Sequence, residues 1–371
     1  MPRRLRFVDL ARQEAPLGPR IRRALDGVAR RRDFTLGKAL TDFERRLASY
    51  VGVRDAVGTS SGGAALELML RALDLGPGDE VIVQANSYIA TAFAALNVGA
   101  KPVLVDCRAA DFQMDPARVE AAVTSRTRAI LATHLYGYAA PMGELSDIAK
   151  RKGLGLLEDA AQAAGTRYGA RFCGALGAAA AFSFYPSKNL GCWGDGGAVT
   201  TDDSGLARSI RVWRSYGDEV KNRHTVIGLN ARLDTLQAAV LSAKLPALDS
   251  GNALRRAAAE NYRRAFADLS LLERIILPPI EVPGQTPNFH LFVIQAPRRD
   301  ALRRHLAEEG IETGLHYPTP IHLQPVMRPL KLGRFPAAEA LAPRLLSLPM
   351  FAGLTAGDCM RVARSIKRFY D

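Results

Sequence analysis

A lysine and an aspartate have the surroundings in this chain that best suit chemistry. Lys188 lies in an apolar, small-residue stretch that runs from Phe182 to Gly191, and Asp159 follows an apolar run farther upstream. A free ammonium group is costly to bury, whereas a Schiff base between the lysine and an aldehyde removes that cost. A carboxylate is the partner that a pyridinium nitrogen needs. Together, the two residues indicate pyridoxal phosphate (PLP) as a cofactor.

Two further segments contain groups that suit a phosphate. Residues 59–63 read Thr-Ser-Ser-Gly-Gly and lie between an expected strand and an expected helix, where glycine amides and a helix N-terminus favour an anion. Ser183 lies shortly before Lys188, across a turn that Pro186 makes. A serine- and glycine-rich loop is also typical of a simple helix cap, and Asp159 could cap a helix in the same way. Lys188 is the residue that favours the cofactor interpretation.

The composition limits the class of protein. The chain has 371 residues, of which 48% are hydrophobic, so it is too long for one small core and two domains are expected. It has no run of about 20 uncharged apolar residues and no recognisable secretory signal, so we expect a cytoplasmic protein that does not enter a membrane. The four cysteines are scattered, which predicts neither a metal site nor a disulfide framework.

The formal net charge of +13 raises the alternative of a nucleic-acid-binding protein. The arginines, however, are spread along the chain and interleaved with acidic residues, and no nucleic-acid-binding motif accompanies them. We therefore expect no nucleic-acid partner, and part of the positive charge is available to an anionic small substrate.

Short apolar runs alternate with helical patterns from about residue 55 onward. We expect strands at 56–58, 80–83, 101–105, 129–133, 154–157, 179–184 and 197–200. Helical patterns separate most of these strands, which predicts βαβ units and a mainly parallel sheet. We assign this α/β part, with the segment before it, to a large domain over residues 1–244.

The remainder of the chain has a different pattern of elements. We expect helices at 229–248, 252–269, 300–309 and 356–369, and a strand at 290–295. After the first helix, which closes the large domain, these elements predict a smaller α+β domain over residues 245–371.

Nine motifs, in order along nearly the whole chain, resemble the DegT/StrS-type nucleotide-sugar aminotransferases. They are residues 58–62, 76–81, 134–137, 158–162, 183–191, 194–198, 230–234, 316–318 and 346–349. The resemblance implies the aspartate aminotransferase architecture (fold type I), PLP as the cofactor, and a homodimer with active sites at the subunit interface.

The resemblance also implies a role for each matching residue. Lys188 would be the Schiff-base lysine and the proton shuttle, and Asp159 would pair with the pyridinium nitrogen. The other implied cofactor contacts are Gln162 near the phenolic oxygen, Tyr88 stacked on the ring, the amides of Gly62 and Gly63 with Ser183 at the phosphate, and Asn230 of the partner subunit at the same phosphate.

Two positions depart from the family pattern. Gly63 stands where a threonine or an alanine is frequent, and Gln84 replaces a usual proline. Neither change removes a catalytic group, so they bear on the rigidity of the phosphate loop and not on the reaction type.

The reaction that the resemblance implies is a ping-pong transamination. L-Glutamate is the expected amino donor, and the acceptor is a keto group on a hexose carried by a nucleoside diphosphate. Residues 86–91 and 189–195 resemble the branch that acts on 3-keto (6-deoxy) sugars, so we favour C3 over C4. The segment at 230–244 also resembles enzymes for 3-keto uronic acid derivatives. His316 and Tyr317 are expected substrate contacts, although a histidine before Tyr-Pro is as often structural.

Two other classes remain open. A PLP-dependent sugar dehydratase would share the fold, but such relatives replace the Schiff-base lysine by histidine or add cysteines for an iron–sulfur cluster. A non-catalytic regulator would use the fold without turnover. The presence of Lys188 and the scattered cysteines argue against the dehydratase, and the presence of Lys188, Asp159 and Ser183 argues against the regulator.

Overall fold

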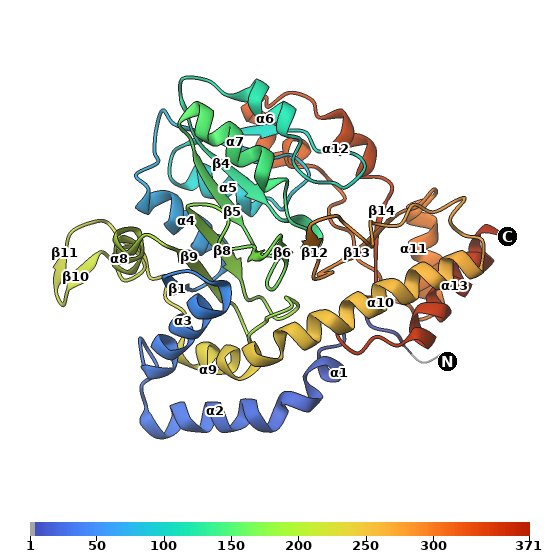
Figure 1. Ribbon diagram of the computed structural model, residues 1–371, viewed down its shortest axis with the longest axis horizontal. Coiled ribbons are helices and arrows are strands. Elements are labelled where there is room, and N and C mark those ends of the chain that lie inside the picture. Colours follow the sequence, from blue (N-terminus) through green and yellow to red (C-terminus); the bar gives the residue numbers. More distant parts are fainter. Residues whose placement is uncertain (1–3) are drawn as a thin grey trace.

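A seven-stranded sheet forms the centre of the computed structural model, which describes residues 4–371 (Figure 1). The strand order is β1-β9-β8-β5-β4-β2-β3. The strands are β1 Asp55–Thr59, β2 Glu80–Gln84, β3 Lys101–Val105, β4 Thr127–Thr133, β5 Gly155–Asp159, β8 Ala179–Ser183 and β9 Gly197–Thr201. Strand β9 alone runs in the direction opposite to the other six strands. The prediction of a mainly parallel sheet is therefore confirmed.

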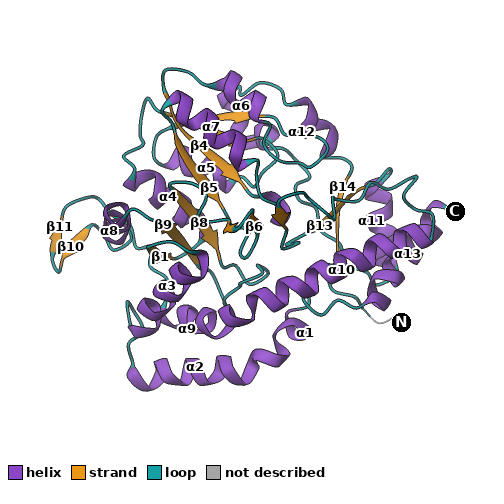
Figure 2. Cartoon of the chain, in the orientation of Figure 1, coloured by secondary structure: helices purple, strands orange, loops and turns teal. Residues whose placement is uncertain are grey.

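Five helices flank this sheet (Figure 2), and three of them begin at a capping side chain. Ser61 Oγ accepts from the amide of Ala64 at the start of one helix, and Asp203 caps another. These helices are α4 Gly62–Ala72, α5 Ala90–Asn97, α6 Pro116–Ala122, α7 Met142–Lys152 and α8 Ser204–Trp213. The helical patterns at 64–73, 90–98, 116–122 and 144–152 predicted the first four of them to within a few residues.

The N-terminal helices were not assigned from the sequence. They are α1 Leu10–Glu14, α2 Gly18–Arg31 and α3 Lys38–Val51. Helix α9, Thr235–Lys244, packs between α2 and α3 and extends the same layer (Figure 1). Apolar residues of α3 and α9 share one core cluster with β8, so these helices support the strand that precedes Lys188.

The C-terminal part is built around a long helix and a two-stranded antiparallel sheet. Helix α10, Leu248–Asp268, packs against α13, Ala356–Tyr370, and strand β13, Phe292–Gln295, pairs with β14, Leu345–Leu348. Helices α11, Arg299–Glu308, and α12, Pro336–Leu341, complete it. The predicted boundary near residue 245 falls between α9 and α10 and stays a prediction.

One helix prediction is wrong at its start. The sequence predicted a helix over 229–248, but α9 begins at Thr235. Residues 229–234 are extended because their backbone pairs with other segments. Ser60 N–H donates to Ala231 O at 2.9 Å, and Arg232 forms a β-bridge with Thr59. Tertiary hydrogen bonds here override a pattern that is apolar enough for a helix.

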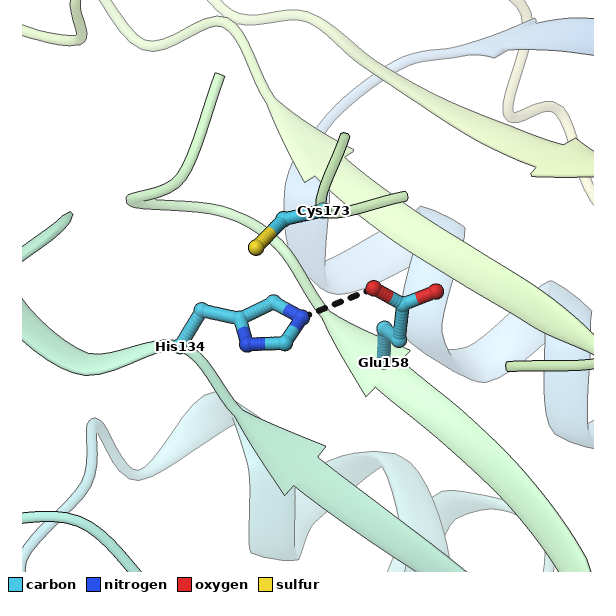
Figure 3. Close-up of side chains that lie close together, drawn as sticks. All are labelled: His134, Glu158 and Cys173. Carbon is cyan, nitrogen blue, oxygen red and sulfur yellow. Dashed lines mark hydrogen bonds and ion pairs between the residues drawn. The ribbon is translucent and has the colours of Figure 1, made fainter. Parts of the chain in front are cut away.

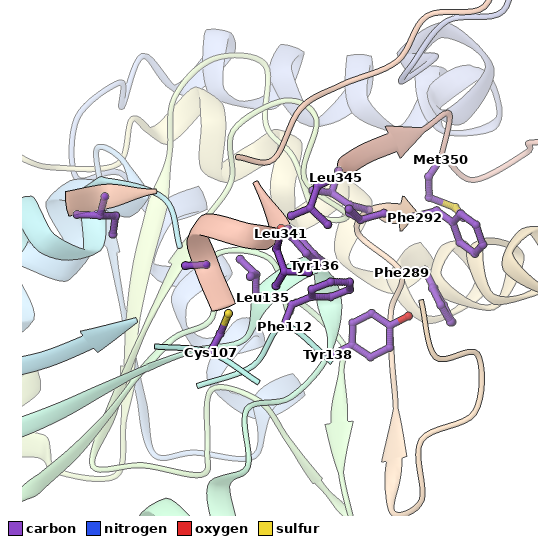
Figure 4. Close-up of a cluster of buried hydrophobic side chains, with 14 of the residues drawn as sticks. Cys107, Phe112, Leu135, Tyr136, Tyr138, Phe289, Phe292, Leu341, Leu345 and Met350 are labelled. Carbon is purple, nitrogen blue, oxygen red and sulfur yellow. The ribbon is translucent and has the colours of Figure 1, made fainter. Parts of the chain in front are cut away.

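The junction between the sheet and the C-terminal part is filled by aromatic and aliphatic side chains (Figure 4). Phe112 and Tyr136 come from the loops beside the sheet, and Phe289, Leu341 and Leu345 come from the C-terminal part; all are buried. This packing keeps the loops at the carboxyl ends of the strands against the C-terminal part. Among the described residues, no helix is long and apolar enough to span a membrane.

Candidate active site

The predicted cofactor residues gather at the carboxyl edge of the parallel strands. Asp159 is the last residue of β5, and Ser183 is the last residue of β8. The sequence placed Asp159 after its strand; the strand in fact extends to include it. Parallel α/β sheets bind their ligands at this edge, because loops from neighbouring strands converge there.

Lys188 lies in a tight turn after β8. Its backbone N–H donates to Tyr185 O at 2.8 Å, and Gly191 approaches Pro186 O so closely that a Cβ there would lie 2.4 Å from it. Burial of the amine lowers the pKa of Lys188 to about 8, although the charge of Asp159 opposes the shift. Within residues 4–371 no side chain accepts a hydrogen bond from its Nζ. The amine is therefore both enclosed and chemically available.

Asp159 is a buried carboxylate with few hydrogen bonds. Thr91 Oγ1 donates to Oδ2 at 2.9 Å, and the Ala161 amide donates to Oδ1 at 3.1 Å. Burial raises the pKa of Asp159, against these hydrogen bonds and the charge of Lys188. A cationic N–H donor at this carboxylate would reverse that shift. Thr91 was missed as a site residue, and nothing in its helical pattern distinguishes it from an ordinary buried threonine.

Gln162 connects two loops beside Asp159. Its Oε1 accepts from the Tyr136 amide at 2.6 Å, and its Nε2 donates to Tyr317 Oη at 3.0 Å. The Tyr317 ring in turn lies 5.5 Å from the ring of Tyr88, which is half-exposed. The structure thus brings three predicted residues, Gln162, Tyr317 and Tyr88, into one contact chain.

His316 is held on two sides. Its Nδ1 lies 2.8 Å from Ser347 Oγ, and its backbone carbonyl accepts a hydrogen bond from the hydroxyl of Tyr136. Burial, together with the charge of Lys188, lowers the pKa of His316 to about 4, so the ring is neutral.

The phosphate residues form a close contact between α4 and β8. A Cβ on Gly62 would lie 2.6 Å from Ser183 Cβ, so this position requires glycine. Gly62 and Gly63 are the first residues of α4 and have no intrahelical acceptor for their amides. A Cβ on Gly63 would meet nothing closer than Ser61 Oγ at 3.8 Å, which fits the alanine or threonine frequent there.

Within residues 4–371, no hydrogen bond joins the Asn230 side chain to the other predicted cofactor residues, although Ala231 next to it accepts from the Ser60 amide. Asn230 is exposed and forms a β-bridge with Ser215, next to the hairpin of β10, Asp218–Val220, and β11, Arg223–His224. Its backbone is therefore fixed while its side chain faces outward.

These observations fit PLP on chemical grounds. The site offers an enclosed amine without a hydrogen-bond acceptor, a buried carboxylate whose pKa an added cation would lower, and helix amides without acceptors beside a serine hydroxyl. An aldehyde, a pyridinium nitrogen and a phosphate are the groups that these three features suit.

A second buried cluster lies beside Asp159 and was not predicted as a unit (Figure 3). Glu158 Oε2 lies 2.8 Å from His134 Nε2, and the Cys173 thiol points toward the same ring. Backbone amides complete the carboxylate: Gly174 donates to Oε2, and Leu176 and Gly177 donate to Oε1, each at 2.7 Å. Burial opposes ionisation of Glu158, but the hydrogen bonds from His134 and the amides hold its pKa below the usual range.

This cluster has a suitable set of metal ligands, but the ring nitrogens of His134 and the oxygens of Glu158 are already hydrogen-bonded. The amide of Ala140 donates to His134 Nδ1 at 3.0 Å, so the ring is neutral with its proton on Nε2, directed at Glu158. Both oxygens of Glu158 are occupied as well. The cluster therefore acts as a structural support, and the His134 amide, which donates to Asp159 O at 3.0 Å, connects it to the site.

Comparison with known proteins agrees with this geometry. The profile of the DegT/DnrJ/EryC1/StrS aminotransferase family matches residues 17–367. The chain is 44% identical to the pleiotropic regulatory protein of Geobacillus stearothermophilus, over 98% of both chains. It is also 44% identical to dTDP-3-amino-3,4,6-trideoxy-alpha-D-glucose transaminase of Streptomyces venezuelae, over 99% of this chain and 96% of that one.

A solved structure gives the same result. The crystal structure of DesV from S. venezuelae in complex with a ketimine intermediate superimposes with a TM-score of 0.95 at 44% identity, covering 100% of this chain and 99% of that chain. The match extends through the sheet and the C-terminal part alike, which confirms the fold type I architecture that the motifs implied. The chain therefore belongs to the DegT/DnrJ/EryC1/StrS aminotransferase family and is a PLP-dependent aminotransferase.

Proposed function

We propose that this enzyme transfers an amino group from L-glutamate to C3 of a keto hexose carried by a nucleoside diphosphate. The observation that carries the proposal is the pair of Lys188, an enclosed amine with a pKa near 8, and Asp159, a buried carboxylate at the same sheet edge. The names of the S. venezuelae relatives, one a 3-amino-sugar transaminase, favour C3.

Lys188 is the proposed acid and base of the reaction. A lysine with a pKa of about 8 exchanges protons near neutral pH far more readily than an ordinary lysine, so Nζ can take a proton from the donor Cα and return one. The bound cofactor supplies an electron sink and holds the amino group between the two half-reactions. Asp159 would hold the pyridinium nitrogen in its protonated form, because a buried carboxylate stabilises an adjacent cation.

The other predicted residues have proposed positioning roles. The amides of Gly62 and Gly63 with Ser183 would hold the phosphate, Tyr88 would stack on the ring, and Gln162 would approach the phenolic oxygen. The Tyr136 amide fixes the position of Gln162, and a side chain that orients a ring needs such support. His316 and Tyr317 would contact the sugar.

We propose a homodimer in which Asn230 of the partner subunit completes the phosphate site. Asn230 is exposed, and so is Ile227, of which 93% is exposed, on the segment that joins Asn230 to the hairpin of β10 and β11. Tyr185 and Trp193, on either side of Lys188, are about half-exposed. Such large apolar side chains around a site are typical of an interface core.

Two further expectations are proposals of the same kind. We propose a boundary between the large and small domains near residue 245, where α9 ends and α10 begins. We also propose a cytoplasmic location, because all four cysteines are free and buried, which suits a reducing compartment.

The substrate proposal is tested by a screen of keto-sugar nucleotides. The holoenzyme is incubated with L-glutamate and, separately, 3-keto, 4-keto and 3-keto uronic acid nucleotide sugars, and the product is identified by NMR. Amination at C3 of a 6-deoxy hexose is the expected result. Amination at C4, or only of the uronic acid, would replace the proposed substrate, while the aminotransferase assignment would stand.

The name of the Geobacillus relative keeps a regulatory function as a second candidate. Visible absorption separates the two functions without a sugar. An aminotransferase changes its cofactor absorption when glutamate is added, because the amino group moves to the cofactor. A protein that binds PLP but shows no such change with any amino donor would be a non-catalytic regulator.

A further inference from the structure

Four aromatic rings form a row that begins outside the predicted site. Phe7 stacks on His316 with ring centroids 5.7 Å apart and an interplanar angle of 18°. His316 packs edge-on against Tyr317 at 5.5 Å, and Tyr317 lies 5.5 Å from Tyr88. The last three rings belong to residues with proposed site roles. Phe7 belongs to the N-terminal segment, residues 4–9, which no site prediction included.

The backbone of the N-terminal segment is fixed on both sides of Phe7. Leu5 is buried and forms a parallel β-bridge with Ile311. The Phe7 amide donates to Glu312 Oε2 at 3.1 Å, and the Phe7 carbonyl accepts from the Met350 amide at 3.1 Å. The position of the Phe7 ring is therefore set by the fold of the C-terminal part, as it would be in a regular strand.

The rings of Phe7 and His316 pack closely against the backbone of Gly314. A Cβ on Gly314 would lie 2.7 Å from His316 Cε1 and 3.0 Å from Phe7 Cζ. Ser347 occupies His316 Nδ1 at 2.8 Å, whereas Nε2 has no hydrogen-bond partner among residues 4–371. The imidazole is thus held in one orientation with one nitrogen left for a ligand.

We propose that Phe7 is a positioning residue for the keto-sugar substrate, which fixes the imidazole of His316 so that Nε2 can hydrogen-bond the sugar. The inference rests on the proposed function, because it takes His316 as a substrate contact. A ring that is packed in advance loses little conformational entropy when the sugar binds, so the stack favours substrate binding more than the chemical step.

A neutral imidazole suits this task. Burial and the charge of Lys188 lower the pKa of His316 to about 4. At neutral pH the ring can therefore form a hydrogen bond with a sugar hydroxyl without repelling the Lys188 amine. Removal of Phe7 would expose one face of the ring to water and relieve part of the burial that keeps it neutral.

Kinetics of holoenzyme variants test the proposal. Phe7→Ala should raise KM for the aminated keto-sugar nucleotide by about 10-fold, with kcat and the glutamate half-reaction changed by less than about 3-fold. Phe7→Tyr keeps a ring to stack on His316, so its KM should stay closer to the wild-type value than that of Phe7→Ala. Arg6→Ala, an exposed neighbour on the same segment, is the matched control.

A titration gives a readout that does not depend on turnover. NMR of histidine-labelled enzyme should place the pKa of His316 near 4 in the wild type. It should rise toward the ordinary value of about 6.5 in Phe7→Ala but not in Arg6→Ala. His316→Asn identifies the resonance.

Three results would overturn the inference. An unchanged sugar KM in Phe7→Ala would show that the stack does not position the substrate contact. An unchanged titration would show that Phe7 does not control the environment of His316. An equal effect of Arg6→Ala, or an equal loss in the glutamate half-reaction, would show that the segment acts only through general stability. If the wild type aminates no keto-sugar nucleotide, the proposed function itself fails, which is a separate result.

Discussion

Glu158 and Asp159 are neighbours on β5, and both carboxylates are buried, yet their surroundings are opposite. Glu158 accepts hydrogen bonds from His134 and from three backbone amides. Among residues 4–371, the Asp159 carboxylate accepts only from the Thr91 hydroxyl and the Ala161 amide. Accordingly, the pKa of Glu158 is lowered, whereas burial raises that of Asp159.

The difference follows from the strand itself. Successive side chains of a strand point to opposite faces of the sheet, so two adjacent acidic residues enter two different environments. On one face the carboxylate is fully satisfied and holds loops together. On the other face, the Asp159 carboxylate can still bind a cationic ligand. An incompletely satisfied buried carboxylate is costly to stability, which is a cost expected at a functional site.

The largest effect is expected at the amine that faces Asp159. Lys188→Ala should lower the rate of transamination by about 10⁴-fold or more, because no other side chain at the site replaces its proton transfer. The variant should still bind PLP, as measured by equilibrium dialysis. Transamination at a rate within 10-fold of the wild type would contradict the assigned role.

Asp159→Asn should lower the rate by about 10²- to 10³-fold without loss of stability. The amide retains the shape, its oxygen can accept from Ala161 and its NH₂ can donate to Thr91 Oγ1, but it cannot stabilise a cation. Thermal melting of the cofactor-free protein should show a Tm equal to or above that of the wild type. A lower Tm with normal activity would mean that Asp159 is the structural carboxylate.

Glu158→Gln should lower the stability of the fold and leave the activity nearly unchanged. The amide NH₂ would face the amide donors of the network, so we expect a loss of about 3 kcal/mol in the free energy of unfolding. Urea unfolding of the cofactor-free protein measures it. Activity per folded molecule should change by less than about 10-fold. Unchanged stability would show that the four hydrogen bonds contribute nothing net.

The pH dependence of stability should separate the two carboxylates as well. Because the pKa of Glu158 is lowered in the folded state, its contribution is complete above its ordinary pKa of 4.5 and is lost as pH falls below it. Asp159 has a raised pKa, so the cofactor-free protein loses stability as pH rises from 3.8 through that raised value. Glu158→Gln should flatten the first slope and Asp159→Asn the second. Urea titrations from pH 3 to 7 that showed the same slope change in both variants would contradict the comparison.

The smallest effect is expected from the hydroxyl that orients Asp159. Thr91→Val keeps the side-chain shape and removes one hydrogen bond of 2.9 Å, so the rate should fall by about 10-fold. Thr235→Val provides a matched control, since Thr235 is buried in α9 and donates no hydrogen bond to the site. Equal rates for wild type and Thr91→Val would show that Ala161 alone suffices to hold the carboxylate.

The local sequence identified Lys188 and Asp159 but not the hydrogen-bond network around Glu158. Lys188 and Asp159 could be predicted because a lysine in an apolar turn and an acidic residue at a strand end are unusual in themselves. Glu158 was visible only as part of a family motif, since its partners His134, Gly174 and Gly177 come from loops whose approach depends on strand order. Thr91 was invisible for the same reason.

The fold shows the same division. The seven strands of the central sheet and four of the helices that flank it could be predicted because their apolar patterns are local. The extended segment at 229–234 could not, because Ala231 and Arg232 are held by hydrogen bonds to residues far away in sequence. Phe7 gave no signal either, because its contact with His316 joins opposite ends of the chain.

Reductive trapping is the most direct test that Lys188 forms the Schiff base with PLP. The PLP-loaded wild type is treated with borohydride, digested, and mapped by mass spectrometry. We expect one reduced pyridoxyl phosphate group per chain, attached to Lys188. The rate of attachment to the cofactor-free protein should rise with pH with a midpoint near pH 8, since the neutral amine is the reactive form. A label on another lysine, or no label, would contradict the role of Lys188 as the Schiff-base residue.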